Sequence, residues 1–417
     1  MHANSSTRSL AGSLPALLLF VPFVLIQGCA SVAPTVDGHG PWPTHFHDAS
    51  RTNLCPGGVV LPVKMDWEKE KSPFEFFKVY PKAQLSGPVV SEGVLFVGST
   101  DRSFYAFDYR TGKVLWEFKA EYFIESTPTV EGDRVCFGSS DGFMRCLDRN
   151  TGKELWKYQA RSEIISSPLI LGERLYFSSS DDRITSLDMN TGEKVWVYTR
   201  GTFRTVSARV LSSPAAAADG GKIFNIFSDG ALVALEAETG RLLWDKDVAG
   251  DFSSAGRIRR TPMVAGDRVF VIDSTGALLA LDVEKGTVLE TYDTLEARDF
   301  VAPVDGVLVV AGTDRIVAVD RATGSTLWSR ELEKSPVATV FAANGELFVI
   351  SNYTVPRLGL KWLTKTKGYM EVLDMKDGKL LWEKKFPSPV TPNAGCAENS
   401  FALFTDQGEV QVFGQDR

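Results

Sequence analysis

The sequence predicts an all-β fold, an eight-bladed β-propeller of four-stranded antiparallel blades. The first observation behind this prediction is a recurring motif, which reads TGKVLW at 111–116, TGKELW at 151–156 and TGEKVW at 191–196. The second is the pattern between the motifs, where apolar and polar residues alternate over short stretches separated by Gly, Asp and Asn. Such stretches are typical of antiparallel strands joined by tight turns. Four-stranded units of roughly 40–50 residues are typical of propeller blades.

The second repeat shows how one unit divides. Strands are expected at 127–130, 134–139, 143–148 and 153–158, with turns at EGD, DG and RNTG between them. The alternation has a period of two in each stretch, and no long helical pattern occurs in the chain after its N-terminal leader. Each unit therefore predicts four strands and no helix.

The motif itself has a structural interpretation. In Asp-x-x-Thr-Gly, the Asp and Thr side chains can bond nearby backbone groups, and Gly accepts a positive φ. The Trp that follows lies on the outermost strand, where a large ring can be buried between neighbouring blades. We therefore interpret these residues as joints between blades and not as a cofactor site. The structural positions include Gly112, Gly152 and Gly192, and Trp116, Trp156, Trp196, Trp244, Trp328 and Trp382, with Glu290 in the place of Trp once.

The two ends of the chain complement each other. Seven motifs give seven outer strands, and an eighth is expected at 62–70, which carries Trp67 but no preceding Thr-Gly. The segment 397–413 supplies inner strands and then stops without an outer one. We infer eight blades, with the N-terminal strand closing the last blade. Closure removes sheet edges that would otherwise promote aggregation.

Composition limits the class of function. The chain has 417 residues, of which 44% are hydrophobic and 23% charged, which is enough for a large globular core. Its net charge is −7. A general nucleic-acid binder is expected to be basic, so this class is disfavoured.

The N-terminus predicts a lipoprotein signal peptide over 1–28. Arg8 precedes an apolar run at 13–26 that is short for a membrane span. The residues IQGC at 26–29 resemble a bacterial lipobox, which implies that Cys29 becomes a lipidated N-terminus. The alternative is ordinary cleavage with Cys29 incidental. Because Ala30 follows and not Asp, the resemblance implies the outer membrane, with the protein facing the periplasm.

Residues 29–59 are expected to form a lipidated, flexible tether, and residues 60–417 the propeller. The stretch 30–50 is rich in Pro, Gly, Ser and His and has no periodicity. Its three histidines, at 39, 45 and 47, have no fixed carboxylate or thiol partner, so no metal site is predicted.

Four cysteines remain after Cys29, and export makes disulfides possible. Cys136 and Cys146 flank an apparent turn, where they would sit opposite each other on a hairpin. Cys55 and Cys396 would tie the first segment to the last. The alternative for each cysteine is a small apolar side chain that fills a buried site.

Asp-x-x-Thr-Gly-x-x-x-Trp at this spacing resembles the repeat of the pyrroloquinoline-quinone (PQQ) enzyme type of propeller, over about 60–415. That repeat is shared by PQQ dehydrogenases and by non-enzymatic binders. The dehydrogenases resemble one another in an adjacent Cys-Cys pair and a calcium site with a catalytic Asp, and no adjacent Cys pair occurs here. No His follows residue 47, which removes the commonest acid–base side chain from the propeller. We therefore expect no enzyme and no cofactor, with a ligand-binding propeller as the alternative.

A lipobox followed by this repeat resembles the BamB-like lipoproteins of the outer-membrane β-barrel assembly machinery. The resemblance implies a non-catalytic scaffold that aids insertion of outer-membrane proteins. Its implied partners are the POTRA domains of a BamA-like barrel protein, and unfolded outer-membrane proteins as clients. The alternative is a propeller lipoprotein of another envelope complex.

Three segments are longer than the repeat requires. In the linker 201–214, Val206 and Ala208 fall on Leu positions of the family's partner-binding element and Arg209 on its Arg. The linker before Pro262 has Arg257, Arg259 and Arg260 where the family has acids. The alternative for both linkers is a solvated connection.

The third segment is the insertion 352–369, which interrupts a strand pair of the seventh unit. It carries Arg357, Lys361 and Trp362 among other basic, aliphatic and aromatic residues. This mixture suits contact with a protein or an anionic membrane surface. Loops of this length are functional or disordered.

Overall fold

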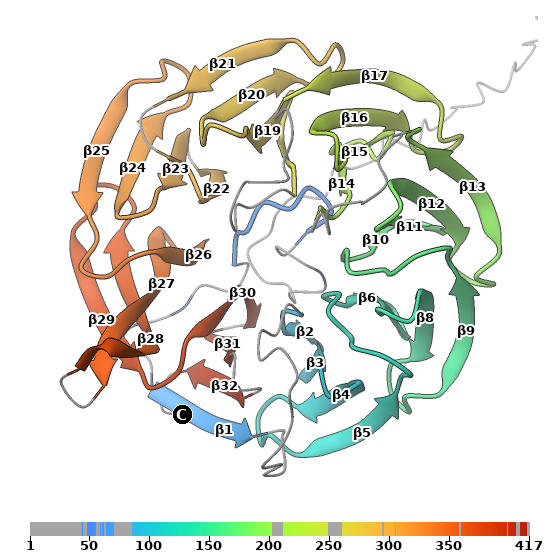
Figure 1. Ribbon diagram of the computed structural model, residues 1–417, viewed down its shortest axis with the longest axis horizontal. Helices are drawn as coiled ribbons and strands as arrows, with labels where there is room; N and C mark the ends of the chain where they lie inside the picture. The colour runs from blue at the N-terminus through green and yellow to red at the C-terminus, as the bar shows by residue number, and fades with distance from the viewer. Residues whose placement is uncertain are drawn as a thin grey trace, which may run out of the picture. The chain divides into compact units, whose positions relative to one another are not determined.

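The computed structural model describes residues 44, 48–55, 59, 61, 64–70, 86–201, 212–248, 261–293, 296–304, 306–357, 360–397, 399–405 and 409–414. These residues belong to the second of two compact units, Val36–Arg417; the first is Met1–Thr35. They form eight four-stranded sheets arranged in a ring, which confirms the all-β, eight-bladed prediction (Figure 1). Within the described ranges, no helix has the length and hydropathy of a membrane span.

The first four blades follow the chain from the innermost to the outermost strand. Blade 1 contains β2 (Val89–Ser91), β3 (Val94–Gly98), β4 (Ser103–Asp108) and β5 (Val114–Lys119). Blade 2 contains β6 (Thr129–Glu131), β7 (Arg134–Gly138), β8 (Phe143–Asp148) and β9 (Glu154–Gln159). Blade 3 contains β10 (Leu169–Leu171), β11 (Arg174–Ser179), β12 (Arg183–Asp188) and β13 (Lys194–Thr199). Blade 4 contains β14 (Ala215–Ala216), β15 (Lys222–Ile226), β16 (Ala231–Glu236) and β17 (Leu242–Asp247).

The next three blades repeat this order. Blade 5 contains β18 (Met263–Ala265), β19 (Arg268–Ile272), β20 (Leu278–Asp282) and β21 (Val288–Tyr292). Blade 6 contains β22 (Asp299–Val304), β23 (Val307–Ala311), β24 (Arg315–Asp320) and β25 (Thr326–Glu331). Blade 7 contains β26 (Val337–Ala343), β27 (Glu346–Arg357), β28 (Leu360–Asp374) and β29 (Leu380–Phe386).

Blade 8 is built from both ends of the described chain. Its inner strands are β30 (Val390–Ala397), β31 (Ser400–Thr405) and β32 (Glu409–Gly414), and its outer strand is β1 (Lys64–Glu70). β1 pairs antiparallel with β32, and the Gln411 side chain donates a 2.6 Å hydrogen bond to Glu68. The inner strand β30 contacts β2 on one side and β26 on the other.

The core lies between neighbouring blades. The middle strands are buried along nearly their whole length, whereas an outer strand such as β5 alternates between exposed and half-buried residues. Cys136 and Met144 of blade 2 share one apolar cluster with Leu175 and Phe177 of blade 3. Because each middle strand is covered on both faces, the hydrophobic effect stabilises every blade through its two neighbours.

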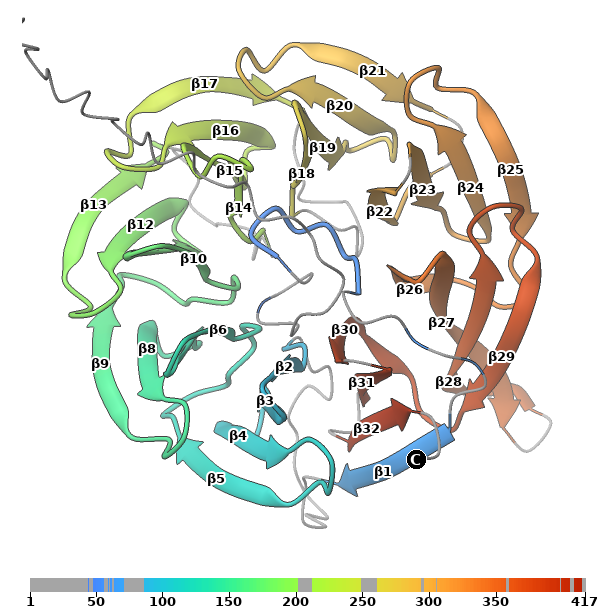
Figure 2. The ribbon, with the colours of Figure 1, turned by 180° about the vertical axis from the view of Figure 1, so that it is seen from behind.

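Residues 48–55 lie at the centre of the ring, inside the innermost strands (Figure 2). The Ala49 carbonyl accepts a 2.8 Å hydrogen bond from Ala216 of β14, and the Cys55 amide donates a 2.6 Å bond to Ala342 of β26. These residues fall within the range expected to form the tether, but the structure packs them inside the propeller. The reason is physical: the inner strands present backbone donors and acceptors at this point, and the segment pairs with them.

The insertion 352–369 is not the loop that the sequence predicted. β27 and β28 continue through it as paired strands, from Ser351 opposite Tyr369 to Arg357 opposite Leu360. β-branched residues and the alternation of Tyr353, Val355 and their neighbours suit an extended hairpin. The insertion therefore lengthens two strands of blade 7 (Figure 1).

Candidate partner-binding site

The Asp-x-x-Thr-Gly turn joins the third strand of a blade to its outer strand. In blade 2, one carboxylate oxygen of Asp148 accepts hydrogen bonds from the Thr151 amide at 2.8 Å and the Thr151 hydroxyl at 2.7 Å. Gly152 follows with φ of 72°, in the left-handed region that favours glycine. The hydroxyl and amide bonds from Thr151 lower the pKa of the Asp148 carboxyl below its ordinary value.

Five of the motif Trp residues bind to the turn of the following blade. The Trp156 indole donates a 3.0 Å hydrogen bond to the Met189 carbonyl, and its ring covers Gly192. A Cβ at Gly192 would lie 2.6 Å from a ring carbon of Trp156, so only glycine fits. The same carbonyl bond and glycine contact recur for Trp116 on Arg149 and Gly152, Trp196 on Ala237 and Gly240, Trp244 on Val283 and Gly286, and Trp328 on Met375 and Gly378. Among the described joints, the motif therefore ties one blade to the next.

The exceptional blade 5 lacks this contact. Glu290 takes the place of Trp, and a Cβ at Gly324 of blade 6 would meet nothing within 4 Å. Glu290 instead lies 2.8 Å from the Arg268 guanidinium and accepts a hydrogen bond from the Tyr292 hydroxyl. Burial, followed by the Glu290 contact, raises the pKa of Tyr292. Glu290 therefore pairs within its own blade, and among the described residues no Trp–Gly contact joins blade 5 to blade 6.

The partner-binding residues expected in the two long linkers lie outside the described residues. These are Val206, Ala208 and Arg209, and Arg257, Arg259 and Arg260. Only the flanking strands are described: β13 and β14 flank one linker in the chain, and β17 and β18 flank the other. In each case these are the outer strand of one blade and the inner strand of the next.

The basic residues of the insertion belong to the hairpin. Arg357 is the last residue of β27, and Lys361 and Trp362 follow the first residue of β28; their side chains, like that of Trp67 in β1, are outside the described set. At the base of the hairpin, the Lys334 ammonium lies 5.7 Å from the centre of the Tyr353 ring. The hairpin extends from blade 7 (Figure 1).

The four cysteines differ in state. A disulfide joins Cys136 to Cys146, which are direct partners in the register of β7 and β8. Cys55 and Cys396 are buried free thiols in one apolar cluster, so the bond expected between them is not formed in this structure. Burial and the neighbouring Cys55 thiol raise the pKa of Cys396, which keeps its thiol protonated.

Arg51 is a central residue that the sequence interpretation missed. Its side chain is fully buried, and its guanidinium donates to the Pro214 carbonyl at 3.0 Å, the Pro168 carbonyl at 3.1 Å and the Thr44 hydroxyl at 2.7 Å. It therefore ties the N-terminal segment to blades 3 and 4. In the sequence, Arg51 stands out only as an isolated Arg in a segment without other basic residues. No local pattern indicates that its side chain is buried.

The residues that the structure describes contain no candidate metal centre. Within them, no group of three or more His, Cys, Asp or Glu side chains is arranged to hold a metal ion. The histidines at 39, 45 and 47 lie outside the described ranges.

Comparison with known proteins gives one family and several similar folds. Many solved structures resemble the chain, and the three described here are each under 20% identical to it, so they show the fold alone. BamB from Moraxella catarrhalis is 19% identical, with a TM-score of 0.66, over 85% of this chain and 100% of its own. A europium-containing methanol dehydrogenase is 13% identical, with a TM-score of 0.69, over 92% and 99%. The designed protein Ika8 is 18% identical, with a TM-score of 0.64, over 80% and 97%.

A comparison with curated protein sequences gives no match. The model of one family, described as outer membrane protein assembly factor BamB, matches residues 64–145, 138–303 and 296–416. These matches cover more than half of the chain and nearly all of the ring, including both ends of blade 8. The chain therefore belongs to the family of outer membrane protein assembly factor BamB.

Proposed function

We propose that the protein is a non-catalytic scaffold lipoprotein of the outer-membrane β-barrel assembly machinery. In this proposal Cys29 carries the lipid, and the propeller faces the periplasm from the outer membrane. The linker segments 201–213 and 250–261 bind POTRA domains of a BamA-like barrel protein, and the ring aids insertion of outer-membrane proteins. The family match over the whole ring carries the proposal.

The centre of the ring supports a scaffold over a ligand-binding propeller. The centre is where the innermost strands converge and where a propeller offers concave space. Here the chain's own residues 48–55 occupy it, with Arg51 and Asn53 fully or nearly fully buried. A small ligand at this position would have to displace a segment that hydrogen-bonds to the inner strands of blades 4, 5 and 7.

The placement of the two linkers supports a protein contact. In the chain they connect blade 3 to blade 4 and blade 4 to blade 5, so both belong to neighbouring blades and can serve a single partner. These three blades are joined by the Trp196 and Trp244 contacts, which keep their spacing rigid. A rigid spacing reduces the conformational entropy lost on binding.

A pull-down from envelope extract tests the proposal. The wild-type chain is expected to recover a POTRA-containing barrel protein, and Arg209→Glu to lose it. Lys153→Glu is the matched control: Lys153 is exposed in the turn between β8 and β9 of blade 2, a blade that neither linker joins, and the change should leave recovery unchanged. If the wild type recovers no such partner, or if both variants behave alike, the proposal is wrong.

The alternative, a quinone-binding propeller, rests on the fold shared with the methanol dehydrogenase. Equilibration with PQQ and calcium followed by gel filtration distinguishes it. Co-elution of PQQ absorbance with the protein would favour the alternative, whereas a scaffold elutes without it.

A further inference from the structure

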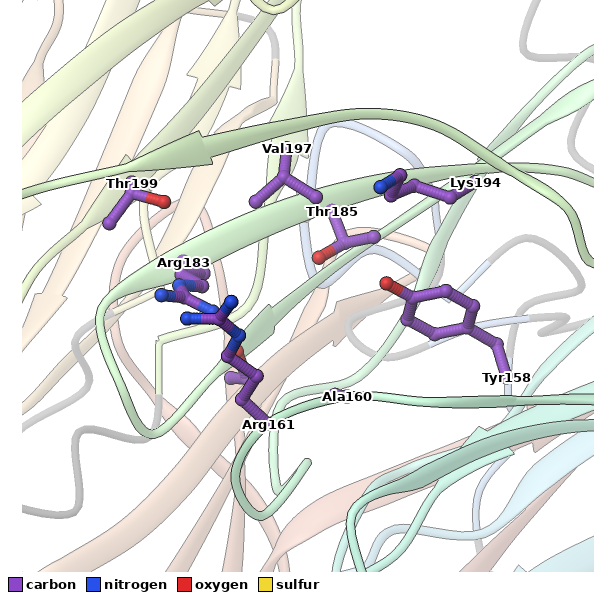
Figure 3. Close-up of a pocket in the computed structure, with 9 residues that line it drawn as sticks. Tyr158, Ala160, Arg161, Arg183, Thr185, Lys194, Val197 and Thr199 are labelled. Carbon is purple, nitrogen blue, oxygen red and sulfur yellow. The ribbon is translucent and has the colours of Figure 1, made fainter.

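A surface pocket of about 250 Å³ opens between blades 2 and 3 (Figure 3). Its walls come from the end of β9 and the residues after it, from the end of β11, and from β12 and β13. Neither the repeat motif nor the joint uses it. The lining residues are Tyr158, Ala160, Arg161, Ser179, Arg183, Thr185, Lys194, Val197 and Thr199.

The lining is strongly basic. It contains the cations of Arg161, Arg183 and Lys194 and no carboxylate. Just outside the pocket, an Asp181 carboxylate oxygen lies 3.3 Å from the Nε atom of Arg183. Among the described residues, this is the only ion pair that any of the three cations makes. Among the residues that the structure describes, none forms a hydrogen bond with the Nη atoms of Arg183. The local charge is therefore about +2, in a protein whose net charge is −7.

Neutral donors complete the lining. The hydroxyls of Tyr158, Thr185 and Thr199 line the same pocket as the cations. Burial raises the pKa of Tyr158, while the nearby charges of Arg183 and Arg161 oppose the rise. Tyr158 therefore stays a protonated donor at neutral pH, and both guanidinium groups act on it.

At the two neighbouring blade interfaces, carboxylates of the protein itself pair with arginine side chains. Between blades 1 and 2, Arg145 stands where blade 3 has Thr185, and it lies 2.8 Å from Asp141 and 3.6 Å from Glu154. Between blades 3 and 4, Arg200 likewise pairs with two aspartates. Each of these two interfaces thus matches one Arg to two carboxylates. Of these three interfaces, only the one between blades 2 and 3 has more cations than carboxylates, and its cations line an open pocket.

We propose that this pocket binds a phosphate group, either free or as a monoester. A phosphate monoester carries about −1.5 to −2 charges at neutral pH, which balances the local charge, whereas one carboxylate leaves a cation unmatched. Planar guanidinium groups bind phosphate oxygens through paired N–H donors, and hydroxyls serve the remaining oxygens. The pocket has room beside the phosphate, with Val197 and Ala160 in its wall, for the carbon skeleton of an ester. The proposal stands independently of the scaffold function.

Isothermal titration of the full mature chain at constant ionic strength tests the pocket. The probes are inorganic phosphate and glucose 6-phosphate, with acetate and glucose as comparisons. Arg161→Ala and Lys194→Ala remove exposed cations without touching the core, so they should fold normally. Lys157→Ala is the matched control, since Lys157 precedes Tyr158 but points to the other side of blade 2, over the Phe143 ring.

We expect both phosphate probes to bind the wild type and the Lys157→Ala variant. Each pocket variant should weaken the affinity on the order of tenfold, the effect of one charge-assisted hydrogen bond. Tighter binding of glucose 6-phosphate than of phosphate identifies an ester as the ligand, and the reverse order identifies the free anion. Binding that is absent, that acetate matches, or that survives both pocket variants overturns the proposal.

Discussion

The contact between a motif glycine and the Trp of the preceding blade can be measured with two single substitutions. Gly192→Ala adds a Cβ at φ of 73°, 2.6 Å from the Trp156 ring. Gly324→Ala adds the same atom at φ of 69° in the equivalent turn, where nothing lies within 4 Å. The chain thus supplies its own control, because Glu290 has replaced the Trp that would cover Gly324.

The expected loss of stability follows from two terms. A left-handed conformation costs a residue other than glycine about 1–2 kcal/mol, and both variants carry this cost. Overpacking against a buried ring costs about 1–3 kcal/mol more, and only Gly192→Ala carries it. Gly192→Ala is therefore expected to lose about 2–5 kcal/mol of unfolding free energy, and Gly324→Ala about 1–2 kcal/mol.

Urea unfolding followed by far-ultraviolet circular dichroism measures the difference without relying on the Trp156 fluorescence that the substitution perturbs. The midpoints of the two variants should differ at an unchanged slope. Equal losses would show that the Trp–Gly contact contributes nothing beyond the turn geometry, and the interpretation of the motif as a joint between blades would fail.

Three further predictions concern the centre of the ring, its cysteines and its turns. Arg51→Met should lower the unfolding free energy by about 2–5 kcal/mol, because buried carbonyls lose charge-assisted bonds; an unchanged urea midpoint would contradict the role of Arg51. In protein purified from an oxidising compartment, peptide mapping should recover Cys55 and Cys396 as free thiols, because both are buried and burial raises the pKa of Cys396; a Cys55–Cys396 cross-linked peptide would refute it. The folded pKa of Asp148 is lowered, so its contribution to stability is present above its unfolded pKa of about 4 and is lost as the pH falls through the folded value. Asp148→Asn should therefore lose less stability than the wild type between pH 5 and pH 3, and parallel profiles would count against this.

The blades could be predicted from local patterns in the sequence. Strand periodicity, turn residues and the Trp motif act within a dozen residues of one another, so the sequence alone located the strands of a unit such as β6 to β9. The same local signals placed Cys136 opposite Cys146, because the two flank one hairpin. The insertion was found but its structure was not, since its length suggested a loop where the chain forms a continued hairpin.

The candidate sites depended less on local pattern. The linkers were identified by their length and by resemblance, and their partner-binding residues remain proposals. Arg161, Arg183 and Lys194 sit on three separate segments, and each looks like an ordinary surface cation in the sequence. Their convergence follows from how blade 2 faces blade 3, which no spacing in the chain encodes.

The sequence by itself determined the fold class, the number of blades and the residues that join them, because a local motif repeated along the chain marks each of them. Only the tertiary structure decided what fills the centre of the ring, which Trp meets which glycine, and where positive charge collects. Residues 48–55 contact strands as far along the chain as Ala342, and such pairings exist only once the ring has closed. The polar composition around this segment predicted solvent exposure, but unpaired backbone groups of the inner strands bind it instead.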